Sequence, residues 1–280
     1  MKTILVPVED HDSMAAVLRA AWLVAHRFDS YIEGLAVQPA ASEFVALDPL
    51  SSLTMPQVAD SDAEIERDAR QMFESFMASN KVPPAPSPPH PSRLSYAWER
   101  SGTESDTFIG SYGRLFDLII LGRPGRAAQN PRMAPLETAL FESGRPVLIS
   151  PSAPPEKLGH NVLVAWNGST EQARTNVFAM PLLRAADEVT VLTVEGGMTP
   201  GPTGEEAALH LIRNGVPAVS VTVAPDGRTT GEAILDHAKL HGCDLLVKGA
   251  YAQSRLRQMI FGGATRHILA HATLPVLMAH

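Results

Sequence analysis

The chain has 280 residues, of which 45% are hydrophobic and 19% are charged. These proportions are typical of a globular protein with a sizeable core, and they exclude disorder of the whole chain. The formal net charge is −7 and the Lys and Arg residues are scattered, so we expect no nucleic-acid partner. A single cysteine, Cys243, excludes an intrachain disulfide and favours the cytoplasm.

The N-terminus is predicted to form a strand. One Lys precedes a short apolar run, residues 4–8, which ends in Glu9 and Asp10. This run is too short for the core of a signal peptide. A membrane partner is not expected, because no stretch of about 18 apolar residues occurs in the chain.

Three pairs of matching segments divide the chain into two halves. Residues 4–13 match residues 162–169, and both are β-rich runs that end in an acid or amide followed by turn residues. Further along, residues 116–122 match residues 243–249, and residues 145–149 match residues 274–278. Because the order is preserved, the repeat predicts two tandem domains, residues 1–151 and 158–280.

The first half carries extra residues, and its prolines indicate two candidate positions for them. One is residues 38–60, which include Pro39, Pro49 and Pro56. The other is residues 81–92, whose six prolines forbid a helix and favour an extended surface segment. We interpret this Pro-rich segment as a stiff loop, with a docking motif as the alternative.

The second half shows alternating strand and helix patterns. Strands are predicted at residues 161–166, 188–193, 218–223, 244–248 and 275–279, and helices at residues 170–185, 205–214, 231–241 and 264–271. Ser169 is interpreted as a helix N-cap, with Gln172 completing a capping box. The alternation predicts two doubly wound α/β domains, each a five-stranded, mainly parallel sheet with helices on both faces. Ligands bind such sheets beyond the carboxyl ends of the strands.

The stretch from Gly249 to Arg266 is the most informative part of the chain. A strand leads into Gly249, and the pair Gly262-Gly263 opens a helix. Glycines let backbone N–H groups approach an anion, and a helix N-terminus adds unpaired donors and a favourable dipole. Phosphate binding follows as a hypothesis.

This stretch resembles the nucleotide-binding loop of universal stress proteins, whose pattern is Gly, two residues, Gly, nine residues, Gly, then Ser or Thr. Gly249 and Gly262 match the first and third glycines, Ala252 takes the place of the second, and Gly263 stands where the hydroxyl residue would be. Thr265 and the backbone donors of Gly263 and Ala264 are candidate substitutes for that hydroxyl. With the first and closing strands, the resemblance covers essentially the whole chain and implies a Rossmann-like, adenine nucleotide hydrolase-like fold in each half.

The resemblance also implies a function in stress response. It implies a regulatory protein that binds ATP, ADP or AMP in its second half, with Mg as an accompanying ion, and acts through an unidentified protein partner. The nucleoside would contact Asn167 and Val194, each at the end of a strand; a purely core role is the alternative for Val194. Relatives with one domain pair as dimers, so the two halves are expected to pair through their closing strands as an intrachain pseudo-dimer, with a homodimer as a further option.

The first half is interpreted as a degenerate site. Its loop begins with Gly122 and Gly125, but residues 133–136, which align with residues 262–265, read Met-Ala-Pro-Leu. No glycine remains there to meet a phosphate, and Glu9 and Asp10 add negative charge nearby. Any nucleotide is therefore expected in the second half alone.

Two other functions stay open. One is a slow ATP hydrolase or a transferase that uses the same pocket, and the other is a scaffold without nucleotide, which Ala252 and Gly263 favour. The Walker pattern and the nucleophile-elbow pattern are absent, which argues against a fast NTPase or a triad hydrolase. Two histidine pairs, at residues 237 and 241 and at residues 267 and 271, have metal-binding spacing but lack a third ligand, and Cys243 is interpreted as a core residue.

Overall fold

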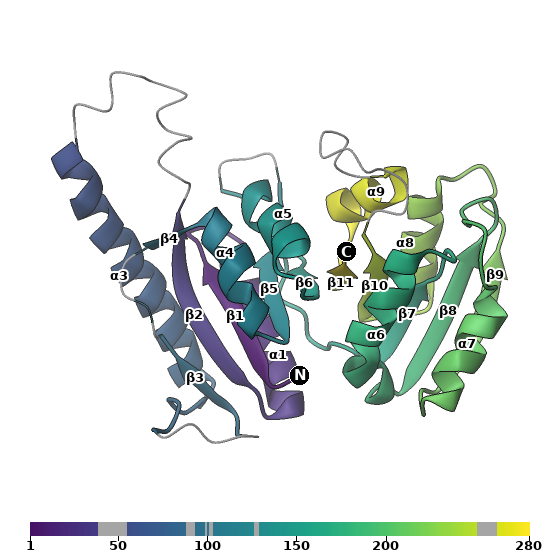
Figure 1. The fold of residues 1–280 in the computed structure, drawn as a ribbon, viewed down its shortest axis with the longest axis horizontal. Helices are drawn as coiled ribbons and strands as arrows, with labels where there is room; N and C mark the ends of the chain where they lie inside the picture. Colours follow the sequence, from purple (N-terminus) through teal and green to yellow (C-terminus); the bar gives the residue numbers. More distant parts are fainter. Residues whose placement is uncertain (39–54, 88–92, 99, 101–102, 126–128, 251–261) are drawn as a thin grey trace.

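The computed structural model describes residues 1–38, 55–87, 93–98, 100, 103–125, 129–250 and 262–280; the other residues are the grey trace of Figure 1. The first half contains β1 (Thr3–Val8), α1 (Met14–Phe28), β2 (Tyr31–Gln38), α3 (Met55–Ser79), β3 (Ser95–Ala97), β4 (Thr103–Ser105), α4 (Asp106–Tyr112), β5 (Leu118–Gly122), α5 (Met133–Glu142) and β6 (Val147–Ser150). The second half contains β7 (Asn161–Ala165), α6 (Thr170–Arg184), β8 (Glu188–Val194), α7 (Gly204–Arg213), β9 (Ala218–Val223), α8 (Thr230–Leu240), β10 (Leu245–Gly249), α9 (Gly263–His271) and β11 (Val276–Ala279).

The strands of both halves form one continuous sheet. Its order is β3-β2-β1-β5-β6-β11-β10-β7-β8-β9, with β4 also paired to β2. Every pairing between these strands is parallel except that of β6 with β11, which is antiparallel and sets Leu148 opposite Leu277. The strand order of the second half is thus the reverse of that of the first half, and the two halves meet at β6 and β11 in the centre of the molecule (Figure 1). The predicted fold class and the predicted pairing of the closing strands are confirmed.

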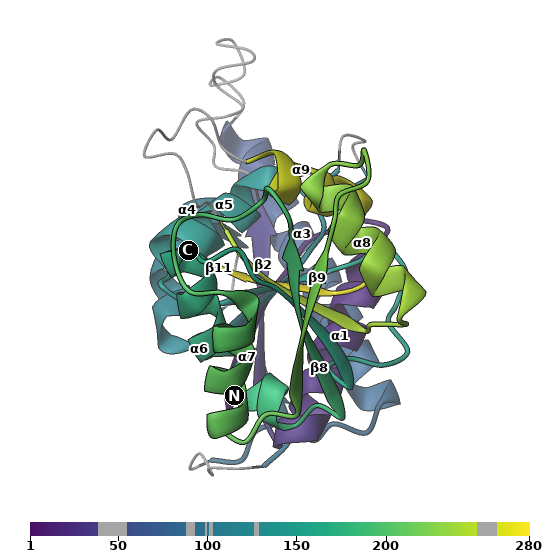
Figure 2. The ribbon, with the colours of Figure 1, turned by 90° about the vertical axis from the view of Figure 1, so that its right-hand side faces the viewer.

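Helices cover both faces of this sheet, and each face has its own apolar core. One core joins buried side chains of α1, α3, α6 and α7, and the other joins those of α4, α5, α8 and α9. Figure 2 shows α7 and α8 on opposite sides of β8 and β9. Strands buried on both faces must be apolar throughout, which is why alternating patterns are absent from the central strands.

The first half departs from a regular five-stranded pattern at its outer edge. Where the second half has the single strand β9, the first half has two short strands: β3 pairs with residues 31–33 of β2, and β4 pairs with residues 36–38. Pro84 forms a further parallel bridge with Tyr96, so part of the Pro-rich segment extends this edge. The remainder of that segment, residues 88–92, lies outside the described residues.

Part of the extra length of the first half is helical. The helix α3 has 25 residues, whereas α7, which takes its place in the second half, has 10. Residues 38–60 were one candidate position for the extra residues. The end of this segment, from Met55, forms the start of α3, and residues 39–54 lie outside the described part. Pro56 falls in the first turn of α3, where a missing N–H removes no helical hydrogen bond. No described helix is long and apolar enough to span a bilayer.

Candidate functional site

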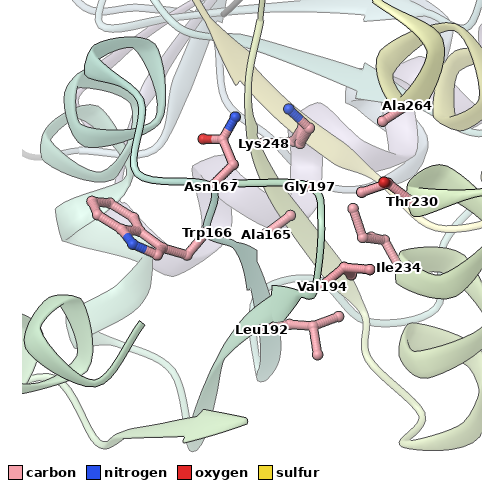
Figure 3. Close-up of a pocket in the computed structure, with 10 residues that line it drawn as sticks. All are labelled: Ala165, Trp166, Asn167, Leu192, Val194, Gly197, Thr230, Ile234, Lys248 and Ala264. Carbon is pink, nitrogen blue, oxygen red and sulfur yellow. The ribbon is translucent and has the colours of Figure 1, made fainter. Parts of the chain in front are cut away.

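A small cavity of about 50 Å³ lies beyond the carboxyl ends of β7, β8 and β10, where α8 and α9 begin. This is the position at which parallel sheets bind ligands. The cavity brings together Asn167, Val194 and Ala264 of the predicted site (Figure 3). Its other lining residues are Ala165, Trp166, Leu192, Gly197, Thr230, Ile234 and Lys248.

The cavity has an apolar side and a polar side. Leu192, Val194 and Ile234 point carbon atoms toward it from below, and Asn167 and Lys248 lie across from them (Figure 3). Val194 is 4% exposed and belongs to the apolar core of its sheet face. It therefore both packs in the core and lines the cavity. A ligand with an apolar part and a polar or charged part matches this division.

Asn167 is held by the turn between β7 and α6. Its backbone carbonyl accepts hydrogen bonds from Thr199 N at 2.8 Å and Thr199 Oγ1 at 3.0 Å. Its side-chain Oδ1 accepts from Ser169 N at 3.2 Å, and Ser169 in turn caps α6. These bonds leave the Asn167 Nδ2 group without an acceptor among the described residues, so the amide has donors to offer a ligand.

Gly249 has a packing role that the sequence did not reveal. A Cβ atom at this position would lie 2.5 Å from Gln172 N and 2.8 Å from Gln172 Cα, so glycine lets α6 approach β10. The Gly249 N–H donates to Gln172 Oε1 at 2.6 Å and is therefore not a free donor for phosphate. The predicted capping box is wrong. Ser169 accepts from Gln172 N as expected, but the Gln172 side chain bonds Gly249 and Asn176 instead of the Ser169 backbone N–H.

The N-terminus of α9 is open in front. A Cβ atom added to Gly262 or Gly263 would meet no atom of the described residues within 4 Å, and neither glycine has a positive φ, so neither is required by strain or by packing against that part of the chain. The first four N–H groups of an α-helix lack intrahelical acceptors. In α9 these are the N–H groups of the N-cap Gly262 and of Gly263, Ala264 and Thr265. The Thr265 side chain is buried, 4% exposed, and lines neither of the two cavities. Ala252 lies outside the described residues.

A larger cavity of about 780 Å³ adjoins the small one. The two share Thr230 and Ala264, at the beginnings of α8 and α9. Its lining includes Arg228, Arg266 and His267. Glu195 lines the same cavity, and Arg228 forms ion pairs with Asp226 and Asp236, so the lining carries both signs of charge.

Lys248, which the sequence reading did not single out, is the most unusual group in the site. It is the next-to-last residue of β10 and only 7% exposed. Burial lowers the pKa of its ammonium group to about 8, and the nearby Glu171 offsets part of that effect. Its Nζ donates to the Gly249 carbonyl at 2.8 Å. The available signal was a lysine inside an otherwise apolar strand.

The corresponding region of the first half is filled by its own side chains. Glu9 follows β1 as Asn167 follows β7, and Arg132 is the N-cap of α5 as Gly262 is the N-cap of α9. Arg132 forms ion pairs with Glu9 and, at 2.6 Å, with Asp106, the first residue of α4. The sequence alignment placed Met133 opposite Gly262; the helix starts place Arg132 there.

This cluster of Glu9, Arg132 and Asp106 is held away from water. The side chains are 11%, 29% and 6% exposed respectively. Burial raises the pKa of the Glu9 carboxyl, and the attraction of Arg132 offsets that rise only in part. A cation placed where a phosphate would lie, and already neutralised by two carboxylates, leaves no charge for an external anion.

The other groups weighed from the sequence have ordinary surroundings. The rings of His237 and His241 lie 4.2 Å apart and those of His267 and His271 lie 4.3 Å apart. Within the described residues, no group of three His, Cys, Asp or Glu side chains is placed to hold a metal. Burial raises the pKa of the Cys243 thiol to about 11, which keeps it protonated and supports its interpretation as a core residue.

Comparisons with known proteins agree with this architecture. Residues 159–280 match the model of the Universal stress protein family. The crystal structure of a universal stress protein from Archaeoglobus fulgidus is similar over 99% of this chain and 95% of that chain, with a TM-score of 0.64 and 15% identity. A putative universal stress protein from Pseudomonas aeruginosa is similar over 100% of this chain and 93% of that chain, with a TM-score of 0.54 and 15% identity. No curated protein matches the chain.

Proposed function

We propose that this chain, which through residues 159–280 belongs to the universal stress protein family, is a regulatory protein that binds an adenine nucleotide in its second half and acts through binding. The observation that carries the proposal is the cavity in which Asn167, Val194 and the start of α9 meet. Action in the cytoplasm, in a stress response and through a protein partner, is part of the same proposal.

The two sides of the cavity suggest how the nucleotide lies. The base would rest against Val194 and Ile234, the ribose would lie near Asn167, and the phosphates would meet the free N–H groups at the start of α9. A volume of about 50 Å³ is less than a nucleoside fills. The nucleotide must therefore also occupy the larger cavity, which it reaches past Thr230 and Ala264.

One nucleotide per chain is expected. In the first half, the positions that correspond to Asn167 and Gly262 hold Glu9 and Arg132, which bind each other. Displacing Arg132 would leave two carboxylates without a partner, at a cost of several kcal/mol. The empty space at the start of α9 has no such occupant among the described residues.

The test begins with the purified full-length protein. It is denatured, and the supernatant is analysed for ATP, ADP and AMP; nucleotide-free protein is then titrated with each of them by calorimetry. We expect a stoichiometry near one. The substitution Gly262→Val should abolish binding, since its side chain would fill the open space through which phosphate approaches. Thr273→Val, at an exposed position beyond the other end of α9, is the control and should bind as wild type.

The outcomes separate the alternatives. Protein that neither carries nor takes up any adenine nucleotide would be a scaffold, and the nucleotide proposal would fail. Two sites per chain would show that the Arg132 cluster does not close the first half. Turnover of ATP at an ordinary enzymatic rate, on the order of 10 per second, would replace action through binding by catalysis.

A further inference from the structure

The ammonium group of Lys248 is buried without a carboxylate partner. Among the described residues it forms no ion pair, and its acceptor is the carbonyl of Gly249. Residues 251–261, which connect β10 to α9, contain no Asp or Glu. Glu171 attracts this charge but forms no ion pair with it, and burial still lowers the pKa, so an anion from outside the chain would be stabilising here.

The fold itself does not require a lysine at this position. The corresponding residue of the first half is Leu121, which pairs with Ile149 of β6 as Lys248 pairs with Met278 of β11. Both residues precede the glycine that ends their strand, and Leu121 is 4% exposed. An apolar side chain therefore fits the same place, and the charge of Lys248 calls for another explanation.

The Lys248 side chain is directed toward the polar side of the small cavity. Its nitrogen lies on the same side as the Asn167 amide, away from Leu192 and Val194 (Figure 3). Ala264, in the first turn of α9, lines the same cavity. An ammonium group, an amide donor and the start of a helix therefore border the same space, and all three favour negative charge.

We propose that Lys248 binds the phosphate nearest the nucleoside, so that the site selects nucleotides and rejects the uncharged nucleoside. This inference rests on the proposed nucleotide function. It adds that the Lys248 ammonium makes a phosphate group necessary for tight binding. AMP carries the required phosphate, so it is sufficient as a ligand.

The protonation of Lys248 makes binding depend on pH. With a pKa of about 8 in the free protein, the ammonium loses its charge as pH rises above that value, and a bound phosphate holds the proton. Among the described residues, Glu171 at the start of α6 is the charged group that acts on it. Glu195, Arg228, Arg266 and His267 line the adjoining cavity, and β7 and β11 contain no charged residue. A phosphate monoester is already fully ionised above its second pKa of about 6, so the affinity should follow Lys248.

The test compares AMP with adenosine by calorimetry at pH 7.5 and pH 9.5, on wild type and on Lys248→Leu, which copies the first half. Wild type should bind AMP at least about tenfold more tightly than adenosine, and its AMP affinity should fall about tenfold at the higher pH. In Lys248→Leu, the AMP preference and the pH dependence should both disappear while adenosine binding is kept. Lys239→Leu removes an exposed lysine of α8 and should behave as wild type.

Two results overturn the inference: equal affinity of wild type for AMP and adenosine, or an unchanged pH dependence in Lys248→Leu. If neither AMP nor adenosine binds wild type, the nucleotide proposal fails, and inorganic pyrophosphate is titrated in the same way. Pyrophosphate binding that depends on Lys248 and on pH would still support an anion site at this residue. No pyrophosphate binding would refute it.

Discussion

At the scale of single residues, Lys248 and Leu121 show how one position of a repeated fold acquires a charge. Both side chains are almost fully buried at the end of a central strand. The lysine is the less stable choice for folding at neutral pH, because its ammonium is removed from water. Its presence therefore has consequences for stability that do not depend on any ligand.

Replacing Lys248 with Leu should flatten the dependence of stability on pH between 7 and 10. The pKa of Lys248 falls from 10.5 to about 8 on folding, so the unfolded chain binds more protons in this range. Stability contributed by this residue is present above the unfolded pKa and is lost as pH falls through the folded pKa. From pH 7 to pH 10, the free energy of unfolding of wild type, measured in urea, should therefore rise by about 2–3 kcal/mol more than that of the variant. Parallel profiles would contradict the prediction.

Removing Arg132 should destabilise the first half. In Arg132→Met the buried carboxylates of Glu9 and Asp106 lose their counter-charge, at an expected cost of about 2–4 kcal/mol in urea unfolding at pH 8. Because the pKa of Glu9 is already raised by burial, protonation at pH 5 should reduce that loss. Arg67→Met breaks an exposed pair with Asp68, 65% and 69% exposed, and should change stability by less than about 1 kcal/mol. Equal effects of the two variants would show that the cluster is not stabilising.

The sequence predicted the edge of the sheet at which the cavity lies, but it did not predict every charged residue near that edge. The alternation of strands and helices directed attention to Asn167, which follows β7, whereas Val194, the last residue of β8, was named because of the family resemblance. Both line the cavity. Lys248 was not predicted, because burial of a strand residue depends on the helices that cover it. Arg132 was missed because the alignment of the halves could not locate a helix start to within one residue.

At the scale of elements, the contact between α6 and β10 explains one glycine of the loop and leaves another unexplained. Gly249 has no room for a Cβ, whereas a Cβ at Gly263 would contact none of the described residues. The pattern Gly, two residues, Gly, nine residues, Gly therefore includes at least one glycine, Gly249, that is explained by packing alone. A sequence motif alone does not separate a packing role from a ligand-binding role.

Gly249→Ala should destabilise the protein, and Gly263→Ala should not. The added methyl at residue 249 would overlap the backbone of α6 at Gln172, which cannot move without displacing the helix. A loss of about 1–3 kcal/mol is expected in thermal or urea unfolding. The same methyl at residue 263 meets no described atom within 4 Å and should leave stability within about 0.5 kcal/mol. A tolerated Gly249→Ala would mean that α6 and β10 separate easily.

Element boundaries in the second half followed the sequence closely, whereas no helix boundaries were predicted for the first half. Hydrophobic periodicity and caps predicted each helix from α6 to α9 to within one residue at its start. The long helix α3 was obscured by Pro56, which was counted as a loop signal although the first turn accepts proline. The split of the outer strand into β3 and β4 has no signal in the sequence pattern that we can identify.

At the scale of the whole molecule, the two repeats are joined more closely than their sequences indicate. The sheet passes from β6 to β11, and each of the two cores contains side chains from both halves. Arg27 of α1 also donates to the Leu158 carbonyl at 3.0 Å and to the Ala185 carbonyl beyond α6. Pairing the closing strands covers two apolar edges that would otherwise be open to aggregation. We propose that residues 1–151 and 158–280, although separate repeats, fold as one unit.

This proposal predicts that a core substitution in one half weakens the other. Leu148 of β6 is 0% exposed and lies opposite Leu277 of β11, so Leu148→Ala should cost about 2–5 kcal/mol. Trp166 reports on the second half alone once Trp22 and Trp98, the other two tryptophans, are replaced by Phe. In that background, Leu148→Ala should lower the urea midpoint seen by Trp166 fluorescence as much as the midpoint seen by circular dichroism. A Trp166 midpoint that does not move would show that the second half unfolds independently, and that the continuous sheet joins two separately stable domains.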